Sequence, residues 1–538
     1  MKEKWVVSAK KADFQAIGQH FGIDPVLARI MRNRGLTDLQ EMNLYLHGTR
    51  ADLNDPHLLK DADLAAQILR EKIKEKKRIR IIGDYDIDGI QSTYILYCAL
   101  RRLGADADFV IPDRILDGYG LNEHLVTRAS QDGIDTILTC DNGISAIDQI
   151  HLAKSLGMTV VVTDHHEVPF TEVDGVRREK VCEADAVVNP KQQACHYPFK
   201  KLCGAAVAFK LVQVLYEVFG LEVSEADCFI ENAGFATVGD VMDLQGENRI
   251  LVKYGLKQLS DTTNPGYRAL LAVNGLEGKK LTAYHIGFVI GPCINASGRL
   301  DTAKRALELL GASSKTEAEK LAGDLKALND SRKDLTAKGT TEAIRLIEET
   351  DLGQDKVLVV YLPDCHESLA GIIAGRIRER YFRPCFVLTD GEEGVKGSGR
   401  SIPGYHMFEE MTKVAELFTK FGGHPMAAGL SIPTENVEIL RKRLNENCRL
   451  TNEDLVPKLS YDAVLPIRYA GEQIIKELEL LEPFGKENDK PLFAAANVRV
   501  KSARVIGKNR NVLKTVLEDD KGSRLEGISF GDIEADLH

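Results

Sequence analysis

The chain has 538 residues, of which 44% are hydrophobic and 28% charged, and its formal net charge at pH 7 is −10. This length exceeds what one hydrophobic core usually supports and predicts about three or four domains. The acidic balance argues mildly against a protein that coats nucleic acid indiscriminately, although a local basic groove can coexist with an acidic exterior.

Two further features of composition indicate the compartment. No apolar run approaches the ~18 residues of a membrane span, and the first residues lack the apolar core of a signal peptide. The ten cysteines are scattered without a zinc-ligand spacing, which favours reduced thiols. We therefore expect a cytoplasmic protein that does not associate with membranes.

Residues 1–75 are predicted to form an N-terminal helical segment of mixed charge, with a helix from Ala62 to Lys76. Lysines and arginines are scattered through the first 50 residues. They could line the entry path of a nucleic-acid strand, but a solvated surface is the commoner explanation for such charges.

Three aspartates follow the first predicted strand of an α/β domain. Arg78–Gly83 is a short apolar run, Asp84, Asp86 and Asp88 come next at alternate positions, and a helical pattern extends from Gly89 to Leu103. Three carboxylates at the end of one strand repel one another, and a divalent cation would neutralise them. The alternative is an acidic turn in which Asp88 caps the helix.

Later apolar runs end in the same way. Asp141 follows the apolar run Ile134–Cys140. Asp164, His165 and His166 follow Met158–Thr163, and Asp240 follows Phe235–Val238. In open α/β sheets the carboxyl ends of the strands form the crevice where ligands bind. Imidazole among carboxylates suits Mn²⁺ or Mg²⁺. Each segment alone is weak evidence for a metal site, but together the segments predict one.

Two loops of the same domain offer positive charge. Arg114 lies in a Pro/Gly-rich loop just past a predicted strand, where a guanidinium can bind phosphate through two hydrogen bonds or can simply be exposed. The segment GPCINASGRL is predicted to be a second loop, in which Asn295 offers a donor and Arg299 a fixed charge.

Residues 311–350 are predicted to form mainly one long polar helix that links two domains. Ser314 and Glu317 have the spacing of a capping box, and a narrow stripe of leucines follows. Gly323 and Gly339 weaken the pattern and could break the helix. We expect this helix to span a gap and to leave a channel that admits one nucleic-acid strand and rejects a duplex.

Residues 351–452 show a second, smaller α/β pattern with two glycine-rich segments. In GSGRS, Ser398 and Arg400 combine a hydroxyl and a guanidinium with flexible backbone, which is typical of a phosphate cradle. In FGGH, His424 is expected on a glycine-rich turn, where it contacts substrate or has only a structural role. Residues 453–538 contain short strands separated by Gly and Asn turns, which predicts a small β-barrel.

The motifs DYDIDG, TCDNG, TDHH and GDVMDLQGENR resemble, in that order, the four motifs of the DHH phosphoesterase superfamily. The segments GPCINASGRL, GSGRS and FGGHPMAAGLSI resemble its RecJ branch, whose members degrade single-stranded DNA from the 5′ end. The resemblance covers roughly Arg78 to the C-terminus. It implies a parallel-sheet DHH catalytic domain over 76–310, a linker helix, a DHHA1 domain over 351–452 and an OB-fold over 453–538. In the OB-fold, the candidate backbone contacts are Lys501, Arg504, Lys508 and Arg510.

The resemblance also implies phosphodiester hydrolysis at a site with two Mn²⁺ or Mg²⁺ ions. The implied metal ligands are Asp86, Asp88, Asp141, His165 and Asp240. Asp84, Asp164 and His166 are implied to act in catalysis, His166 by contacting the phosphate. The implied substrate-binding residues are Arg114, Asn295, Arg299, Ser398, Arg400 and His424, of which Ser398, Arg400 and Arg114 would hold the 5′-terminal phosphate.

The function implied is exonucleolytic degradation of single-stranded DNA to mononucleotides, in DNA repair and recombination in the bacterial cytoplasm. Single-stranded-DNA-binding protein and a RecQ-type helicase are the implied partners. One alternative is a DHH–DHHA1 phosphodiesterase of short oligonucleotides or cyclic dinucleotides, against which the N-terminal segment and the β-rich tail argue. The other is a DHH scaffold without metals in a larger assembly, against which the intact acidic motifs argue.

Overall fold

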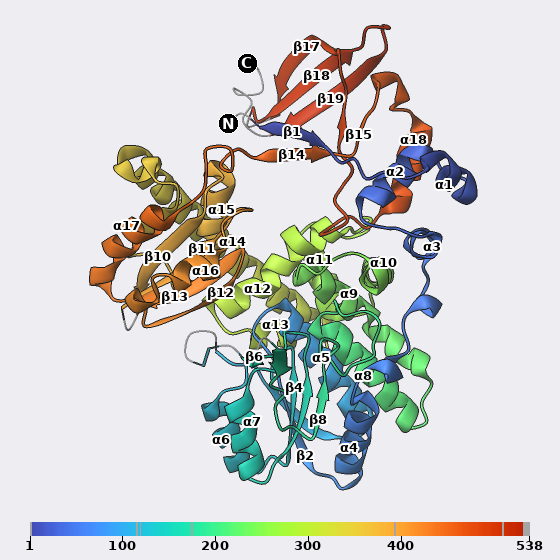
Figure 1. Cartoon of the computed structure of the whole chain (residues 1–538). Helices are drawn as coiled ribbons and strands as arrows, with labels where there is room; N and C mark the ends of the chain where they lie inside the picture. The colour runs from blue at the N-terminus through green and yellow to red at the C-terminus, as the bar shows by residue number, and fades with distance from the viewer. Residues whose placement is uncertain are drawn as a thin grey trace.

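A computed structural model describes residues 3–113, 117–118, 120–173, 176–391, 394–507 and 510–530. Two basic residues of the sequence analysis, Arg114 and Lys508, lie outside these ranges. Figure 1 shows two α/β units side by side at different heights, with a third, β-rich unit above them that contains both the N-terminal and the C-terminal segments.

The first unit is built on a five-stranded parallel sheet with the strand order β3-β2-β4-β5-β8. Its strands are β2 (Arg78–Ile82), β3 (Asp106–Val110), β4 (Thr136–Cys140), β5 (Thr159–Thr163) and β8 (Ala186–Val188). Both faces of the sheet are buried, as the continuous apolar runs predict. The helices α4 (Ala62–Lys74), α5 (Ile87–Arg102) and α8 (Gly204–Val218) cover one face, and α6 (Glu123–Gln131) and α7 (Ile147–Ser155) cover the other. The expected parallel-sheet domain is therefore confirmed, and α4 belongs to its core.

Two segments of this domain differ from the sequence-based expectation. Phe235–Val238 is not a strand but the last part of helix α9 (Ile230–Gly239), so Asp240 follows a helix. GPCINASGRL is not a loop but helix α12 (Gly291–Leu300), which continues from the π-helical turn η4 (His285–Ile290). Both segments are rich in small residues, which permit close helix packing but give little periodic signal. The remaining helices of the domain are α10 (Gly246–Ser260), α11 (Pro265–Val273) and α13 (Lys304–Leu310).

The linker is one unbroken helix, α14 (Lys315–Glu349), and Ser314 caps it by accepting a hydrogen bond from the N–H of Glu317 at 3.2 Å. Its first half packs against α11, α12 and α13, and its second half against α15 (Glu367–Tyr381) of the next domain. Gly339 does not break it: a Cβ there would lie 2.6 Å from Ile373, so this glycine allows close packing of α15. The described part of the chain has no helix with the apolar length of a membrane span.

The second α/β unit contains a five-stranded sheet with the order β12-β13-β11-β10-β9. Its elements are β9 (Leu358–Tyr361), β10 (Cys385–Gly391), β11 (Gly394–Arg400), β12 (Lys420–His424), β13 (Ala427–Ile432), α16 (Met407–Thr412) and α17 (Val437–Asn447). GSGR is therefore not a loop but the end of the central strand β11, and FGGH forms the edge strand β12. The glycines serve packing, because a Cβ at Gly397 would collide with Leu388 and one at Gly399 with Met407.

The two ends of the chain pack together. Strand β1 (Lys4–Val7), which the sequence analysis did not predict, pairs in parallel with β14 (Lys458–Tyr461). The N-terminal helices α1 (Phe14–Phe21), α2 (Pro25–Asn33) and α3 (Leu39–His47) share one apolar cluster with α18 (Glu472–Leu478). The N-terminal helices thus join the C-terminal unit rather than form a separate domain.

The rest of the C-terminal unit is β-rich. Strands β17 (Arg499–Ile506), β18 (Val512–Glu518) and β19 (Arg524–Phe530) form an antiparallel sheet, and β15 (Ala463–Val464) pairs with β16 (Phe493–Ala494). One of the candidate DNA contacts is engaged within this sheet, since Lys501 Nζ lies 3.1 Å from a carboxylate oxygen of Glu518.

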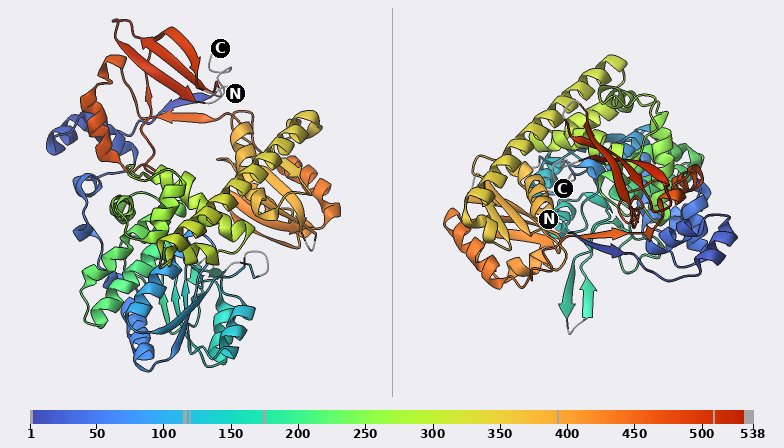
Figure 2. Two further views of the ribbon diagram at one scale, coloured as in Figure 1. Left: turned by 180° about the vertical axis from the view of Figure 1, so that it is seen from behind. Right: turned by 90° about the horizontal axis from the view of Figure 1, so that it is seen from above.

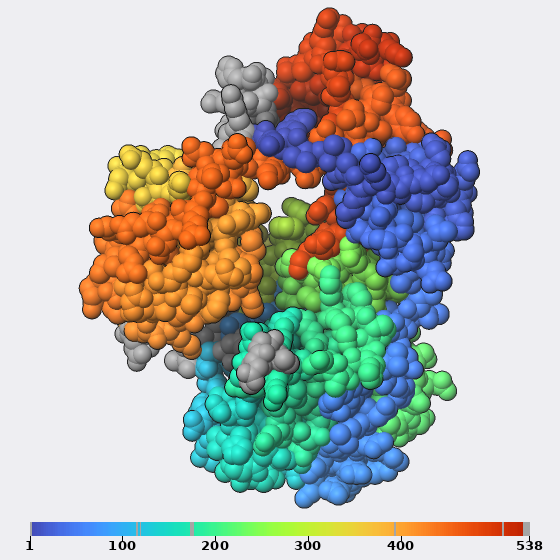
Figure 3. All heavy atoms as spheres, viewed as in Figure 1, coloured from blue at the N-terminus to red at the C-terminus, as the bar shows by residue number. Residues whose placement is uncertain are grey.

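One arginine joins the catalytic, N-terminal and C-terminal parts. Arg249, on α10, donates hydrogen bonds to the backbone carbonyl of Tyr45 in α3 and to four carbonyls of residues 480–483. Its guanidinium also lies 3.9 Å from the centre of the Tyr45 ring. Above this junction, the space-filling view shows an opening through the molecule, bounded by the second α/β unit on the left and by the two chain ends above and to the right (Figure 3). The views from behind and from above show α14 running along the far side from one unit to the other (Figure 2).

Candidate metal centre

Acidic and imidazole side chains converge at the carboxyl ends of β2, β4 and β5. The Nε2 atom of His165, after β5, lies 3.1 Å from Asp141 Oδ1, 3.5 Å from Asp88 Oδ2 and 3.7 Å from Asp240 Oδ2. Asp240 reaches this cluster from the C-terminal end of α9. The structure thus brings together the side chains of all four motifs.

Backbone amides orient two of the aspartates. Asp86 is the N-cap of α5, where its Oδ1 accepts hydrogen bonds from the N–H groups of Asp88 (2.9 Å) and Gly89 (3.2 Å). Asp88 does not cap this helix. Its carboxylate accepts hydrogen bonds from the N–H groups of Gly204 (2.5 Å) and Ala205 (2.7 Å) at the start of α8, the positive end of that helix.

These two amides of α8 were not predicted from the sequence. The signal that could have found them is a helix that begins at Gly204 without a Ser, Thr, Asp or Asn to cap it. Such a helix start needs an acceptor from elsewhere in the fold, and Asp88 supplies it.

Burial and mutual repulsion dominate the electrostatics of the cluster. Burial, and then the charge of Asp86, raise the pKa of Asp84 to about 8. Burial and the charge of Asp88 raise the pKa of Asp240 to about 8 as well, and the same two causes raise the pKa of Asp86 and of Asp141. Without a cation these four carboxyl groups therefore resist ionisation at neutral pH, and a bound divalent cation would favour their ionised form.

The donor set fits a hard divalent cation. His165 is 5% exposed, burial lowers its pKa and so favours the neutral imidazole, and neither ring nitrogen makes a directed hydrogen bond within the described ranges. Three groups of side chains place their ligand atoms within 4.8 Å of one another: Asp84, Asp86 and Asp141; Asp88, His165 and Asp240; and Asp141, His165 and His166. Carboxylate oxygens with one or two imidazoles suit Mn²⁺ and tolerate Mg²⁺.

His166 is held beside the cluster in a charged form. Its Nδ1 lies 2.8 Å from Asp164 Oδ1, and the buried Asp164 also accepts hydrogen bonds from the N–H groups of Ile144, His165 and His166. Burial alone would lower the pKa of His166, but the hydrogen bond and the charge of Asp164 outweigh it and raise the pKa to about 9. The imidazolium is 44% exposed and can meet an anionic ligand.

Two residues of the centre adopt left-handed backbone conformations. Asp141 has a φ of 59°, and Val241, next to Asp240, has a φ of 55°. A β-branched residue is a clear outlier in this region, and such strain persists where the surrounding fold holds it. In this conformation the Asp141 carboxylate lies in the cluster, with Oδ1 3.1 Å from His165 Nε2, and Val241 is 61% exposed.

Asn295 and Arg299, expected to bind substrate, hold protein groups in this structure. Asn295 Oδ1 accepts a hydrogen bond at 3.1 Å from the N–H of Ile87, directly after Asp86. Arg299 donates to the carbonyl of Ser368 at 2.8 Å, in the first turn of α15. Helix α12 therefore connects the metal centre with the second α/β unit.

Replacing Gly298 with alanine should impair activity more than stability. A Cβ at this position would lie 2.5 Å from the carbonyl oxygen of Tyr85, so α12 or the aspartate-bearing turn must shift. Because misplacing reacting groups by about 1 Å can cost on the order of 100-fold, we expect kcat/KM to fall about 10- to 100-fold. Gly323→Ala, which meets nothing within 4 Å on α14, is the matched control. Steady-state kinetics with thermal melting would check this, and unchanged kcat/KM in Gly298→Ala would contradict it.

Ser398 and Arg400 lie on the face of β11 that packs against α15. A Cβ added to Gly371 of α15 would lie 2.7 Å from Arg400 Nη2 and 3.1 Å from Ser398 Oγ. Gly371 is three residues beyond Ser368, which binds Arg299, so Arg299, Ser398 and Arg400, three of the predicted substrate-binding residues, gather at the first turns of α15. His424 is exposed and in register with Arg400 across β13, through Ala427.

Three family descriptions match the chain. They are "DHH family, N-terminal domain" over residues 78–231, "DHHA1 domain" over 354–450 and "RecJ OB domain" over 461–538. The single-stranded-DNA-specific exonuclease RecJ of Escherichia coli (strain K12) is 34% identical over 534 residues, which cover 94% of this chain and 89% of that protein. The chain belongs to the RecJ family. The RecJ of Bacillus subtilis (strain 168) is 35% identical over 98% of this chain, and the chain spans 66% of that relative's length.

Solved RecJ structures share the fold. RecJ from Thermus thermophilus in complex with Mn²⁺ matches with a TM-score of 0.83 and 30% identity, over 98% of this chain and 74% of that one. The Mg²⁺ complex from the same organism matches with a TM-score of 0.77 and 29% identity, over 98% and 73%. The RecJ resemblance and the multidomain α/β architecture with a C-terminal OB domain are thus confirmed. The two expected metals are those that these RecJ structures contain.

Proposed function

We propose that the protein is a metal-dependent exonuclease that degrades single-stranded DNA from the 5′ end to mononucleotides. The observation that carries this proposal is the convergence of three carboxylates on His165 at the crevice of the parallel sheet. Its RecJ relatives are named single-stranded-DNA-specific exonucleases.

We assign two metal positions to the cluster. Asp84, Asp86 and Asp141 would hold one ion, and Asp88, His165 and Asp240 the other, because these two groups share no residue. Asp141 and His165 belong together to the third group, so the two positions adjoin. When bound, two such ions lower the pKa of an attacking water and stabilise the charge that develops on the phosphate. Asp84, first expected in a catalytic role, thus becomes a ligand candidate.

The chain's own residues would hold the scissile phosphate. The His166 imidazolium donates its Nδ1–H to Asp164, and its positive charge would attract a phosphate oxygen. Asp164 acts as a positioning residue, because its hydrogen bonds with Ile144, His165 and His166 fix the turn that carries both imidazoles.

The 5′-terminal phosphate is assigned to the first turns of α15. Arg299, Ser398 and Arg400 gather there, and the N-terminal end of a 15-residue helix adds a favourable dipole. The side chains rather than the glycine amides would bind, since β11 pairs with a strand on each side. Arg114 and His424 remain candidates for further contacts, Arg114 from outside the described residues.

The opening between the domains would give the strand access to the centre and exclude duplex DNA (Figure 3). A helicase of the RecQ type, which separates strands, and single-stranded-DNA-binding protein would then be suitable partners in repair and recombination. We place this activity in the bacterial cytoplasm.

Digestion of end-labelled single-stranded DNA, with Mn²⁺, with Mg²⁺ and with chelator, tests the proposal. We expect mononucleotides to appear from the 5′ end only when metal is present, and blunt duplex DNA to resist. Hydrolysis of cyclic dinucleotides without degradation of the single strand would favour the small-substrate phosphodiesterase instead. Binding without hydrolysis under any metal condition would favour the metal-free scaffold.

A further inference from the structure

A groove of about 1310 Å³ begins beside the metal centre. Val238, Gly239 and Val241, the neighbours of Asp240, line one end of it. From there it runs between α10, the π-helical turn η4 and residues 479–490 of the C-terminal unit. In the space-filling view this C-terminal segment, in orange-red, lies against the green helices at the edge of the opening (Figure 3). Any strand that lies in the groove therefore leads directly to the cluster.

Two aromatic rings of the groove are exposed to solvent. Tyr284 is 63% exposed and Phe288 is 69% exposed, and their rings stack with centroids 5.1 Å apart and planes 25° apart. They flank Gly287 on the π-helical turn, a conformation that occurs often at functional sites. A pair of flat, exposed, parallel rings offers the surface on which nucleic-acid bases stack regardless of sequence.

The charge in the groove is complementary to a phosphate backbone. Six lysines line it (Lys253, Lys257, Lys279, Lys280, Lys486 and Lys490), against four carboxylates (Asp261, Glu479, Glu482 and Asp489). Among the described residues, only Lys280 (with Glu482) and Lys486 (with Asp243) have an ion-pair partner. A local excess of unpaired lysines is unusual in a chain with a net charge of −10.

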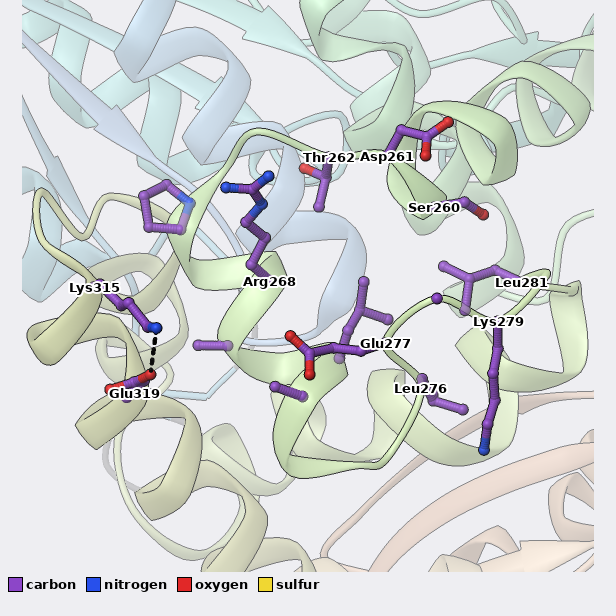
Figure 4. Close-up of a pocket in the computed structure, with 15 residues that line it drawn as sticks. Ser260, Asp261, Thr262, Arg268, Leu276, Glu277, Lys279, Leu281, Lys315 and Glu319 are labelled. Carbon is purple, nitrogen blue, oxygen red and sulfur yellow. Dashed lines mark ion pairs between the residues drawn. The ribbon is translucent and has the colours of Figure 1, made fainter.

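The groove adjoins a second hollow of about 700 Å³, which shares Ser260, Asp261, Gly278, Lys279 and Leu281 with it and whose lining is balanced in charge. Figure 4 shows Arg268 standing in it, between Lys279 on one side and the Lys315–Glu319 ion pair on the other. The groove and this hollow together form a continuous surface that extends away from the metal centre.

One helical run relates the groove to the other sites. It begins with Tyr284, carries Asn295, which holds the aspartate turn, and ends with Arg299, which holds α15. The metal centre therefore lies between the aromatic pair and the first turns of α15, where the 5′ end is assigned.

We propose that Tyr284 and Phe288 form a stacking platform for the bases of the substrate strand on the 3′ side of the scissile phosphate, with Lys253, Lys257, Lys279 and Lys490 on its phosphates. This inference rests on the proposed function for the direction of the strand. The platform binds the part of the strand that has not yet been cleaved, and the substrate therefore stays bound between successive cleavages.

Binding of two labelled strands tests the platform. One is a single-stranded oligonucleotide with all its bases, and the other has the same backbone with abasic residues throughout. With metal removed by chelator, fluorescence anisotropy is measured for the wild type and for the double variant Tyr284→Ala/Phe288→Ala. Because stacking on an aromatic side chain contributes substantially per base, we expect the Kd for the complete strand to rise at least about tenfold. The Kd for the abasic strand should not differ between the two proteins.

Three further variants complete the design. Tyr284→Trp/Phe288→Trp, which keeps flat rings, should bind the complete strand like the wild type. Phe170→Ala removes a ring that is 49% exposed outside the groove and should change nothing. Lys253→Ala/Lys257→Ala should weaken both strands alike and reduce the salt dependence of binding.

Equal losses on both strands in the double alanine variant would show a structural defect and overturn the platform, and so would no loss on either strand. A wild type that binds the complete strand better than the abasic one but never degrades DNA would refute the proposed function alone. A wild type that degrades DNA while the double variant binds normally would refute the platform alone.

Discussion

Replacing Asp141 with asparagine should abolish nearly all hydrolysis of single-stranded DNA. Asp141 is a proposed ligand of one metal position, and it also belongs to a group with His165, a proposed ligand of the other position, so its loss should disturb both. Because residues that merely support metal ligands are typically worth 10–100-fold, we expect a direct ligand that also adjoins the second metal position to be worth about 1000-fold or more in kcat/KM. Single-turnover and steady-state digestion of 5′-labelled strands would measure the loss. Asp148→Asn, an exposed aspartate on α7 of the same domain, should retain full activity.

Thermal melting separates this loss from misfolding. Saturating Mn²⁺ should raise the melting temperature of the wild type, since a ligand that binds only the folded state stabilises it. The rise should shrink in Asp141→Asn. In chelator, by contrast, the variant should melt at the same temperature as the wild type or higher, because one buried, mutually repelling carboxylate has been removed. A variant that keeps wild-type activity, or that melts lower in chelator, would contradict the assignment of Asp141.

Replacing Arg400 with alanine should weaken the recognition of a 5′-phosphate. The guanidinium lies over Gly371 beside Ser398, near the contact between Arg299 and α15. A charge-assisted contact of this kind is worth ~1.5–3 kcal/mol, or roughly ten- to a hundredfold in affinity. We expect kcat/KM to fall by that factor on strands that end in 5′-phosphate and by less on strands that end in 5′-hydroxyl, because a terminal phosphate carries more charge.

The matched control is Arg380→Ala, at the opposite end of α15, where the side chain pairs with Glu348 on the surface. It should leave both substrates unaffected. Mn²⁺ should stabilise Arg400→Ala as it stabilises the wild type, since the ligands belong to the other domain. If Arg400→Ala lost the same factor on both kinds of end, the arginine would serve the strand in general and the 5′ polarity would have another source.

The local apolar pattern of the sequence was sufficient to predict the sheet that carries the candidate metal centre. Strands β2, β4 and β5 are buried on both faces, which makes their sequences continuous apolar runs, and each is followed at once by the acidic or imidazole residues. Asp240 was predicted in the right cluster, but it follows a helix and not the predicted strand. The residues before it are apolar and small, and they fit a buried helix as well as a strand.

Glycine was the main source of error elsewhere. GSGRS and FGGH suggest loops because glycine favours turns, yet Gly397 and Gly399 lie in the middle of a sheet where neighbouring side chains leave no room for a Cβ. That requirement depends on Leu388, Phe386 and Met407, which the local sequence does not reveal. Strand β1 was missed for a similar reason, since its partner, β14, is about 450 residues away in the chain.

The supporting parts of the site were harder to foresee than its ligands. The amides that hold Asp88 come from Gly204 and Ala205, which have no polar side chains to mark them. Asn295 and Arg299 were identified as polar residues of interest, but their contacts with Ile87 and Ser368 depend on how α12 packs. The residue types that can bind a metal are recognisable in a sequence. The residues that orient those ligands through hydrogen bonds are determined by the tertiary structure.

The five hydrogen bonds of Arg249 have a topological consequence. By fastening residues 480–483 to α10 and α3, they close the path that runs from the catalytic domain through α14, the second domain and the C-terminal unit back to its start. The walls of the central opening thus form a continuous loop around whatever passes through it. DNA can then enter only by threading a free end, so a covalently closed single-stranded circle should escape digestion however well it binds outside. A bulky group attached to the 5′ terminus should protect a linear strand in the same way.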